Sequence, residues 1–278
     1  MTESPLFPLL DSAMEAAFAG GTAIMDVYAN SFEVEYKNDR SPLTEADRRA
    51  HNAIEEVLQR TGLPVLSEEG AKTPVEERQK WERYWLVDPL DGTKEFVKRN
   101  GEFAVCIALM QRDNEPAGPL GATSPIAGVV FSPVLNKLYF AAQGLGAYLS
   151  TEAATHQGIS AYERVAMSTR LPLSAKPSTF TILASRSHRS PETDAFIAQK
   201  EQEHGALEFT SMGSALKFGL MAEGAADVYP RYAPTMEWDT AAGQIICTEA
   251  GKQLIDLTTN APMRYNKNEL VNNWFIVQ

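Results

Sequence analysis

Cysteine, histidine and long apolar runs are scarce in this sequence. Its two cysteines, Cys106 and Cys247, lie in apolar segments, so we expect buried core thiols rather than a disulfide or a thiol nucleophile. The four histidines fall in no Cys/His spacing that suggests zinc. The longest uncharged apolar stretch, Phe103 to Met110, is far too short to span a bilayer. These absences argue against a disulfide scaffold, a zinc protein and a membrane-spanning protein.

The N-terminus and the net charge further limit the kind of protein that this sequence can encode. The chain begins Met1-Thr2-Glu3-Ser4-Pro5 and lacks both the basic region and the apolar run of a secretory signal. We therefore expect a cytoplasmic protein, with a loose association with the inner face of the membrane left open. A net charge of −11 argues against binding a long nucleic acid. A small anionic substrate remains compatible, if metal ions or a few Lys and Arg side chains neutralise it.

The first half of the chain is rich in predicted strands. Apolar spacing predicts helices over residues 8–30 and 44–60, the second with Thr44 as its N-cap and Asp47 three residues later. Short apolar runs predict strands at residues 64–67, 84–88, 103–110, 126–131 and 137–142.

After about residue 175 strands and helices alternate. We expect strands at 181–184 and 226–229, and helices at 191–202, 213–223 and 239–250. This change favours a layered α/β or α+β architecture with two subdomains, residues 1–172 and 173–278, and a boundary within Arg170–Ser178.

Carboxylates gather in three segments that each lie at the end of a predicted strand or the start of a predicted helix. The segments are LSEEG at 66–70, WLVDPLDGTKEF at 85–96 and EWDTAAG at 237–243. In the second, Pro89 should end the strand after Asp88 and leave the Leu90 carbonyl outside a ladder. Asp91 follows, and two carboxylates with a carbonyl are hard oxygen donors of the kind that Mg²⁺ accepts. An aspartyl-phosphate mechanism of the haloacid dehalogenase type is rejected, because its nucleophile position is Pro89.

Six collinear strings carry a resemblance to a known family. They are SPLTEAD at 41–47, VLSEE at 65–69, WLVDPLDGTKEFVKRNGEF at 85–103, SRSH at 185–188, GSALKF at 213–218 and YPRYAPTMEWDTAAG at 229–243. In this order they resemble the lithium-sensitive, magnesium-dependent phosphatases of the inositol monophosphatase superfamily, and within it the CysQ-type 3′(2′),5′-bisphosphate nucleotidases. The resemblance implies a five-layer αβαβα sandwich of the sugar phosphatase type, with the site between its halves. It also implies a place in sulfur metabolism.

The resemblance assigns roles by position. It implies two Mg²⁺ ions, or three, and a direct attack by a metal-activated water without a covalent intermediate. The implied metal ligands are Glu68, Asp88, the Leu90 carbonyl, Asp91 and Asp239. Thr93, backed by Asp47 and helped by Glu68, matches the residues that activate the water, and the amides of Gly92 and Thr93 match those that hold the phosphate.

The implied substrate is 3′-phosphoadenosine 5′-phosphate, cleaved to AMP and phosphate. Positions that match substrate contacts are Leu90, Gly92, Thr93, Ser185, His188, Ser214, Lys217, Arg231 and Asp239. An inositol monophosphatase, another sugar-phosphate phosphatase and a catalytically silent metal or nucleotide sensor remain alternatives. Monomer and homodimer both stay open.

Several of these residues also have a purely structural interpretation. Asp47 would serve equally as the partner of Thr44 in a capping box, and Asp239 as a helix N-cap. Lys217 alone would be interpreted as an exposed helix lysine. The cluster of Lys94, Lys98 and Arg99 would be surface charge, which could also raise the local concentration of anions. The order of the motifs favours the functional interpretation for the acids.

Overall fold

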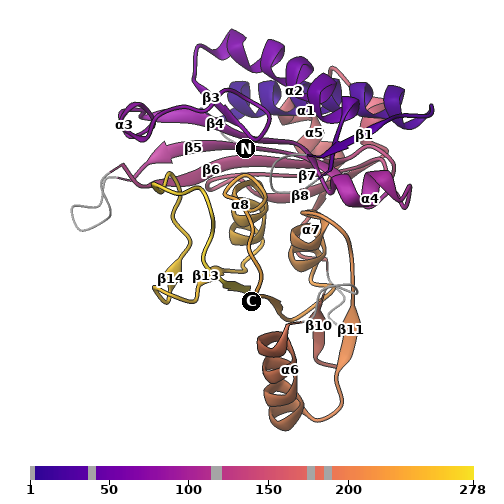
Figure 1. The fold of residues 1–278 in the computed structure, drawn as a ribbon, viewed down its shortest axis with the longest axis vertical. Coiled ribbons are helices and arrows are strands. Elements are labelled where there is room, and N and C mark those ends of the chain that lie inside the picture. The colour runs from indigo at the N-terminus through magenta and orange to yellow at the C-terminus, as the bar shows by residue number, and fades with distance from the viewer. Residues whose placement is uncertain (1–3, 37–41, 114–120, 174–178, 185–189) are drawn as a thin grey trace.

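The computed structural model describes residues 4–36, 42–113, 121–173, 179–184 and 190–278. These residues stack in five layers, helices alternating with sheets (Figure 1). The first layer contains α1 (Phe7–Tyr28), α2 (Glu45–Leu58) and the short α5 (Ala161–Met167). It covers one face of a seven-stranded sheet. In spatial order its strands are β3 (Val65–Ser67), β4 (Arg83–Asp91), β5 (Ala104–Arg112), β6 (Thr123–Ser132), β7 (Lys137–Ala142), β8 (Gly146–Thr151) and β9 (Thr169–Arg170).

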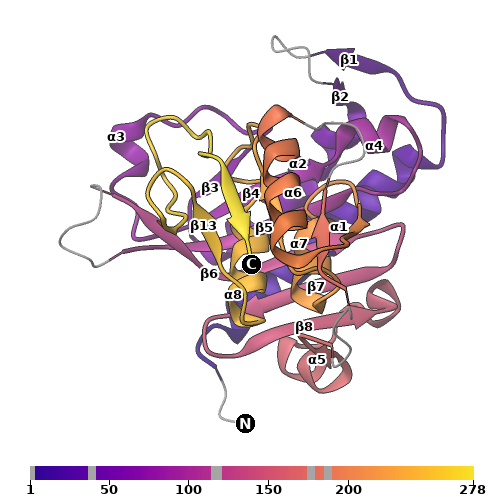
Figure 2. The same ribbon diagram turned by 90° about the horizontal axis from the view of Figure 1, so that it is seen from below.

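The other three layers come from the second half of the chain. The helices α7 (Leu216–Glu223) and α8 (Ala241–Glu249) cover the opposite face of the large sheet. Beneath them lies a four-stranded sheet in the order β12 (Tyr229–Arg231), β15 (Phe275–Val277), β13 (Leu254–Asp256) and β14 (Ala261–Pro262). The parallel pair β10 (Thr181–Leu183) and β11 (Glu208–Thr210) joins β12 through a bridge at Ile182, and α6 (Pro191–His204) packs outermost. Figure 1 shows α6 and α7 below the large sheet, and Figure 2, seen from below, shows them in front of it. The predicted αβαβα sandwich is confirmed.

Both faces of the large sheet are buried, which explains its long apolar strands. On β5, Val105, Ile107 and Leu109 pack against α1 and α2, whereas Cys106 and Ala108 between them face α7 and α8. Since successive side chains point to opposite faces, a strand covered on both sides is apolar without alternation. The same packing confirms that Cys106 is a buried core thiol, and Cys247 in α8 is buried likewise.

Two adjacent glycines interrupt the apolar pattern of α1 because the helix approaches its neighbours closely there. A Cβ at Gly20 would lie 2.7 Å from Ile54 Cδ1 of α2, and one at Gly21 would lie 2.5 Å from Phe131 Cε1 of the sheet. The Phe131 ring is fixed by edge-to-face contact with Phe18, at a centroid distance of 5.0 Å. The glycines therefore allow α1 to sit against both α2 and the sheet.

Most predicted elements are present, and the differences have local causes. The helix predicted at 44–60 is α2 with Thr44 as its N-cap. The expectation that Pro89 ends its strand is wrong, because β4 continues to Asp91 with a register shift after Asp88. Pro89 is tolerated there since β3 pairs with β4 only as far as Val87, so that side of the ladder requires no N–H from residue 89.

The sequence patterns missed the short strands β8, β11, β13 and β15. Each spans only 3 or 6 residues, too few for a periodic signal. The division into residues 1–172 and 173–278 stays a prediction; it follows β9, where the chain leaves the large sheet.

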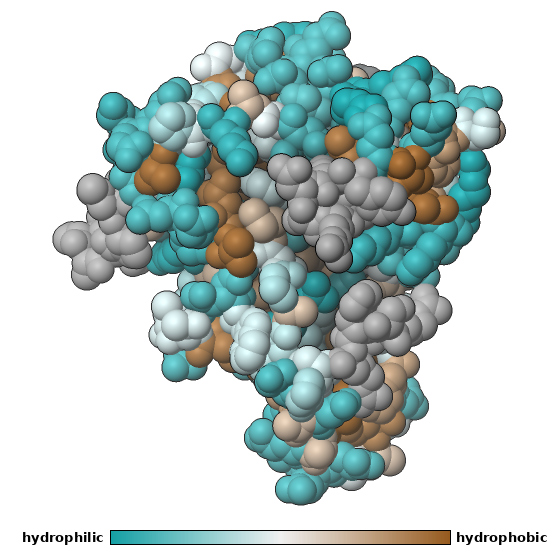
Figure 3. All heavy atoms as spheres, viewed as in Figure 1, coloured by the Kyte–Doolittle hydropathy of each residue, from teal (hydrophilic) through white to brown (hydrophobic). Residues whose placement is uncertain are grey.

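The surface is mainly hydrophilic on the face drawn in Figure 3, where apolar side chains form patches between charged and polar ones. Within the described residues, no helix combines the length and the apolar character needed to cross a membrane.

The close approach of α1 to the sheet predicts the effect of one methyl group. Gly21→Ala should lower the free energy of unfolding by about 1–3 kcal/mol, because overpacking against Phe131 outweighs the better helix propensity of alanine. Denaturant unfolding of Gly21→Ala, Phe131→Leu and the double variant would measure this. The two substitutions should be coupled, with part of the loss recovered in the double variant. A Gly21→Ala protein as stable as the parent would contradict the close packing.

Candidate active site

The core of the site is a group of three carboxylates. Asp88 and Asp91 end β4, and Asp239 lies in the turn that leads into α8. One carboxylate oxygen of each lies within 4.8 Å of the others. At that separation each pair of ionised groups repels by roughly 3–4 kcal/mol at an effective dielectric constant of about 20. Buried acids in this arrangement need either protons or cations.

The acids accordingly have raised pKa values. Burial is the main cause for Asp88, whose pKa rises well above its ordinary value, and the charges of Glu68, Asp91 and Asp239 add to the rise. The pKa of Asp239 is raised well above its usual range by burial and then by Asp91. Burial also raises the pKa of Asp91 to about 6, although the Lys217 ammonium opposes this. A strongly perturbed acid cluster of this kind is typical of a functional site.

Each of the three carboxylates is oriented by a backbone N–H. Leu90 donates to Asp88 Oδ1 at 3.0 Å, and Met236 donates to Asp239 Oδ2 at 2.8 Å. The third bond joins the two halves of the chain, because the amide of Ala215 donates to Asp91 Oδ2. In each pair one oxygen is fixed by the backbone, and these bonds leave the second oxygen for another partner.

Glu68 lies beside this group at the end of β3. Its charge raises the pKa of Asp88, after burial, and also contributes to the raised pKa of Asp239. It does not belong to the three acids whose oxygens all lie within 4.8 Å of one another. The structure therefore places Glu68 at the edge of the acid cluster rather than within it.

Asp47 makes contacts on both sides, with the N-cap residue Thr44 and with Thr93. Its Oδ2 accepts hydrogen bonds from the backbone N–H of Thr44 at 2.7 Å and from the Thr44 hydroxyl at 2.6 Å, which completes a capping box. Its Oδ1 lies 3.1 Å from the Thr93 hydroxyl, which also lies 3.3 Å from the Leu90 carbonyl. Asp47 is buried, which raises its pKa even though the Thr44 hydrogen bonds lower it. The cap thus fixes the carboxylate that orients Thr93.

Gly92 joins the carboxylate strand to the short helix α4 (Thr93–Val97) in a left-handed conformation with φ of 96°. A Cβ at this position would lie 3.1 Å from Ser214 Cβ and 3.2 Å from the Glu102 carbonyl. Both the backbone angle and the close approach of the 213–215 segment therefore require glycine.

A polar cavity of about 570 Å³ opens from the acid cluster. The residues that line it include Asp91, Gly92, Ser214, Lys217, Arg231 and Asp239. The size suits a small-molecule ligand. Ser185 and His188, the other two positions matched to substrate contacts, lie outside the described residues.

Lys217 is not the exposed helix lysine that its position alone suggested. It is 9% exposed, donates to the Met212 carbonyl at 3.1 Å and lies 5.9 Å from the centroid of the Tyr229 ring. Burial lowers the pKa of Lys217 to about 8, while the charge of Asp91 opposes the change. Arg231 lies nearby and donates to the Pro234 carbonyl at 3.3 Å. The cavity is therefore lined by both acidic and basic side chains.

Asp239 does not act as a helix N-cap. The N-cap of α8 is Thr240, and the Asp239 carboxylate instead accepts the Met236 N–H within its own turn.

One cavity residue, Glu102, was missed in the sequence. Its Oε2 accepts the Gly213 N–H at 2.8 Å and thereby anchors the loop that carries Ser214. The partner lies far along the chain, so no local pattern marks the contact.

Comparison with known proteins agrees with this geometry. The model of the inositol monophosphatase family matches residues 6–275. The chain is 42% identical over 252 residues to the 3′(2′),5′-bisphosphate nucleotidase CysQ of Salmonella typhimurium, covering 89% of this chain and 90% of that protein. It is 41% identical over 265 residues to CysQ of Escherichia coli strain K12, covering 94% and 95% of the two chains.

Solved structures give the same result. The crystal structure of CysQ from Bacteroides thetaiotaomicron, a bacterial member of the inositol monophosphatase family, superposes with a TM-score of 0.87 at 45% identity, covering 99% of this chain and 98% of that one. An inositol monophosphatase from Thermotoga maritima, at 22% identity and a TM-score of 0.70, shares the fold. By the family match, the identities and the superposition, this chain belongs to the inositol monophosphatase family.

Proposed function

We propose that this protein removes the 3′-phosphate of adenosine 3′,5′-bisphosphate and releases AMP and phosphate. It is a phosphoric monoester hydrolase, a 3′(2′),5′-bisphosphate nucleotidase. The main support is its identity of 41–42% to bisphosphate nucleotidases over most of the chain. The cavity fits this activity, because it lies beside a cluster of acids and is lined by four basic side chains, those of Lys94, Lys98, Lys217 and Arg231. A cytoplasmic location and a role in sulfur metabolism are parts of the same proposal.

Magnesium is the proposed cofactor, as two ions or three. The oxygen donors suit it, because Asp88, Asp91 and Asp239 present one oxygen each within a small space. The proposed ligands are these three, with Glu68 and the Leu90 carbonyl. When bound, Mg²⁺ would neutralise the phosphoryl oxygens, make a water more acidic and stabilise the leaving oxygen.

The protein's own groups position and deprotonate the attacking water in this scheme. The Thr93 hydroxyl is held by Asp47 Oδ1 at 3.1 Å, so its oxygen can accept the water's proton as the hydroxyl proton moves toward the carboxylate. Glu68 lies beside the cluster as a second acceptor. Attack occurs in line with the leaving 3′-oxygen, without a covalent intermediate.

The second phosphate and the nucleoside bind in the part of the cavity that is lined by Ser214, Lys217 and Arg231. Lys217 and Arg231 supply positive charge, and Ser214 a hydroxyl, in a part of the cavity that adjoins Asp91. The amides of Gly92 and Thr93 hold the phosphate that is cleaved, and Ser185 and His188 remain proposed contacts. A substrate with one phosphate uses only some of these contacts, which favours a bisphosphate over inositol 1-phosphate.

Removing one acid should abolish turnover. Asp91→Asn keeps the hydrogen bond to Ala215 but lowers the negative charge of the cluster, so phosphate release should fall by at least about 10³-fold. Phosphate release from adenosine 3′,5′-bisphosphate and from inositol 1-phosphate, with and without Mg²⁺, would test both activity and substrate. Retained activity in Asp91→Asn would contradict the metal scheme. Tight nucleotide binding by the parent without phosphate release would instead indicate a sensor.

The charge of Lys217 should set the preference for a second phosphate. Lys217→Met should raise the KM for adenosine 3′,5′-bisphosphate about 10–100-fold, because the variant loses a charge-assisted hydrogen bond to the second phosphate. The KM for adenosine 3′-phosphate should change much less. In the parent, the pKa of about 8 means that the ammonium is charged below this pH. The preference should therefore decline as the pH rises through 8, and a preference that is independent of pH would argue against this contact.

Metal removal should make stability depend on pH. The pKa of Asp91 is about 6 in the folded chain against an ordinary 3.8, so between these values the folded state binds more protons than the unfolded state. The metal-free protein should lose stability as the pH rises through that window, and saturating Mg²⁺ should restore it.

Thermal unfolding in EDTA and in Mg²⁺, at about pH 5 and about pH 7.5, measures this dependence. Asp239→Asn serves as the comparison, because it removes one charge and can still accept the Met236 N–H. It should be more stable than the parent in EDTA at the higher pH and gain less from Mg²⁺. If the Tm of the parent changes with neither pH nor Mg²⁺, the proposed metal site is wrong.

A further inference from the structure

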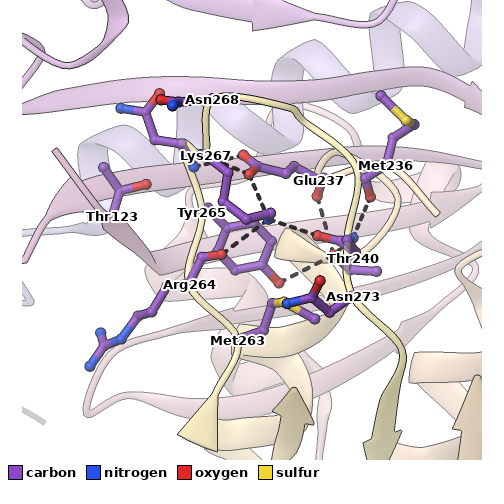
Figure 4. A network of polar contacts seen from close by, with 12 residues as sticks. Thr123, Met236, Glu237, Thr240, Met263, Arg264, Tyr265, Lys267, Asn268 and Asn273 are labelled. Carbon is purple, nitrogen blue, oxygen red and sulfur yellow. Dashed lines mark hydrogen bonds and ion pairs between the residues drawn. The ribbon is translucent and has the colours of Figure 1, made fainter. Parts of the chain in front are cut away.

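A fully buried carboxylate lies two residues before Asp239 and takes no part in the chemistry described above. Glu237 is 0% exposed. Its Oε2 accepts the backbone N–H of Asn266 at 2.7 Å, and its Oε1 accepts the N–H of Lys267 at 3.0 Å. The Lys267 ammonium lies 2.7 Å from the same Oε1. Figure 4 shows the Glu237 and Lys267 side chains directed toward one another. Such charge-assisted contacts offset the cost of burying a charge.

The segment that Glu237 binds is itself attached to the first half of the chain. Tyr265 exchanges backbone hydrogen bonds with Thr123 of β6, at 3.0 and 3.2 Å. The side chain of Asn266 accepts from the buried Arg78 guanidinium at 2.7 Å and donates to the Gly121 carbonyl at 3.0 Å. Glu237 is therefore linked through two residues to the same large sheet that carries Asp88 and Asp91.

The main chain connects Glu237 tightly to Asp239. The Glu237 carbonyl accepts the N–H groups of Thr240 at 3.2 Å and Ala241 at 3.1 Å. Asp239 closes the turn from the other side, because its N–H donates to the Met236 carbonyl at 3.2 Å and its Oδ2 accepts the Met236 N–H. A displacement of Glu237 would therefore move Asp239 with it.

We infer that Glu237 is a positioning residue for the metal site. It anchors the turn to the large sheet, holds Asp239 opposite Asp88 and Asp91 against their mutual repulsion, and so raises the affinity for the divalent cation. This inference rests on the metal-dependent function proposed above. Removing a hydrogen bond that orients a metal ligand from outside the coordination sphere typically lowers the metal affinity 10- to 100-fold.

The variant Glu237→Gln tests the role while leaving all three acids of the cluster in place. Glutamine has the same length, but its amide group can accept only one of the two backbone N–H groups and presents its own N–H groups to the other or to Lys267. Calorimetric titration of the metal-free protein with Mg²⁺ should show a Kd about 10–100-fold higher than that of the parent. At saturating Mg²⁺, kcat should recover to near the parent value, since every proposed ligand remains.

A matched control separates positioning from general destabilisation. Asp256 is also buried and accepts backbone N–H groups, from Thr258 at 2.7 Å and Thr259 at 3.4 Å, but it supports a turn beside β13. Asp256→Asn should lower Tm without changing the Kd for Mg²⁺. If Glu237→Gln lowers Tm but binds Mg²⁺ as tightly as the parent, the inference is wrong.

Lys267→Met provides a milder second variant if Glu237→Gln does not fold. It removes the ammonium but leaves both backbone N–H donors, and it should raise the Kd for Mg²⁺ about threefold or more. An unchanged Kd in a folded Lys267→Met protein would overturn the inference. A parent that binds no Mg²⁺ would overturn the proposed function, and the inference with it.

Discussion

The carboxylates of Asp88, Asp91 and Asp239 lie close together beside the cavity and repel one another, and the structure around them holds them in place. Two of them leave one strand, and the third comes from a turn much later in the chain. Burial raises the pKa values of all three, and the charge of Asp91 raises those of Asp88 and Asp239 further. An arrangement that costs free energy without cations is stabilised when they bind, so stability and metal binding are linked at this site.

Backbone amides are the means by which the chain orients these acids. Leu90, Ala215 and Met236 each donate an N–H to one of the three, and Thr44 donates to Asp47 in the same way. A backbone donor fixes a carboxylate without adding a bulky side chain to the cavity, and it leaves the second oxygen for another partner. In the capping box of α2, the Asp47 carboxylate has two functions, because it both stabilises the helix and orients Thr93.

The cavity is also where the two halves of the chain are joined. Asp91 accepts from Ala215 and Glu102 accepts from Gly213, so acids of the first half hold the loop that carries Ser214. Glu237 completes the connection in the opposite direction, from the turn of Asp239 to the segment that pairs with β6. The proposed substrate contacts and the proposed metal ligands are therefore placed relative to one another by the same few hydrogen bonds.

The sequence by itself determined the parts of this protein that depend on near neighbours. The capped helix after Thr44, the uncharged strand that becomes β5 and the Asp-Pro-Leu-Asp-Gly segment are local patterns, and their order along the chain indicates the family. Only the tertiary structure decided which residues far apart come together. In the tertiary structure Lys217 is buried close to Asp91, and β4 continues past Pro89. Glu68 lies at the edge of the acid cluster, and Glu237 binds the backbone of a segment far along the chain. The physical reason is that hydrogen bonds and repulsion between such residues depend on distance in space, which no spacing along the chain encodes.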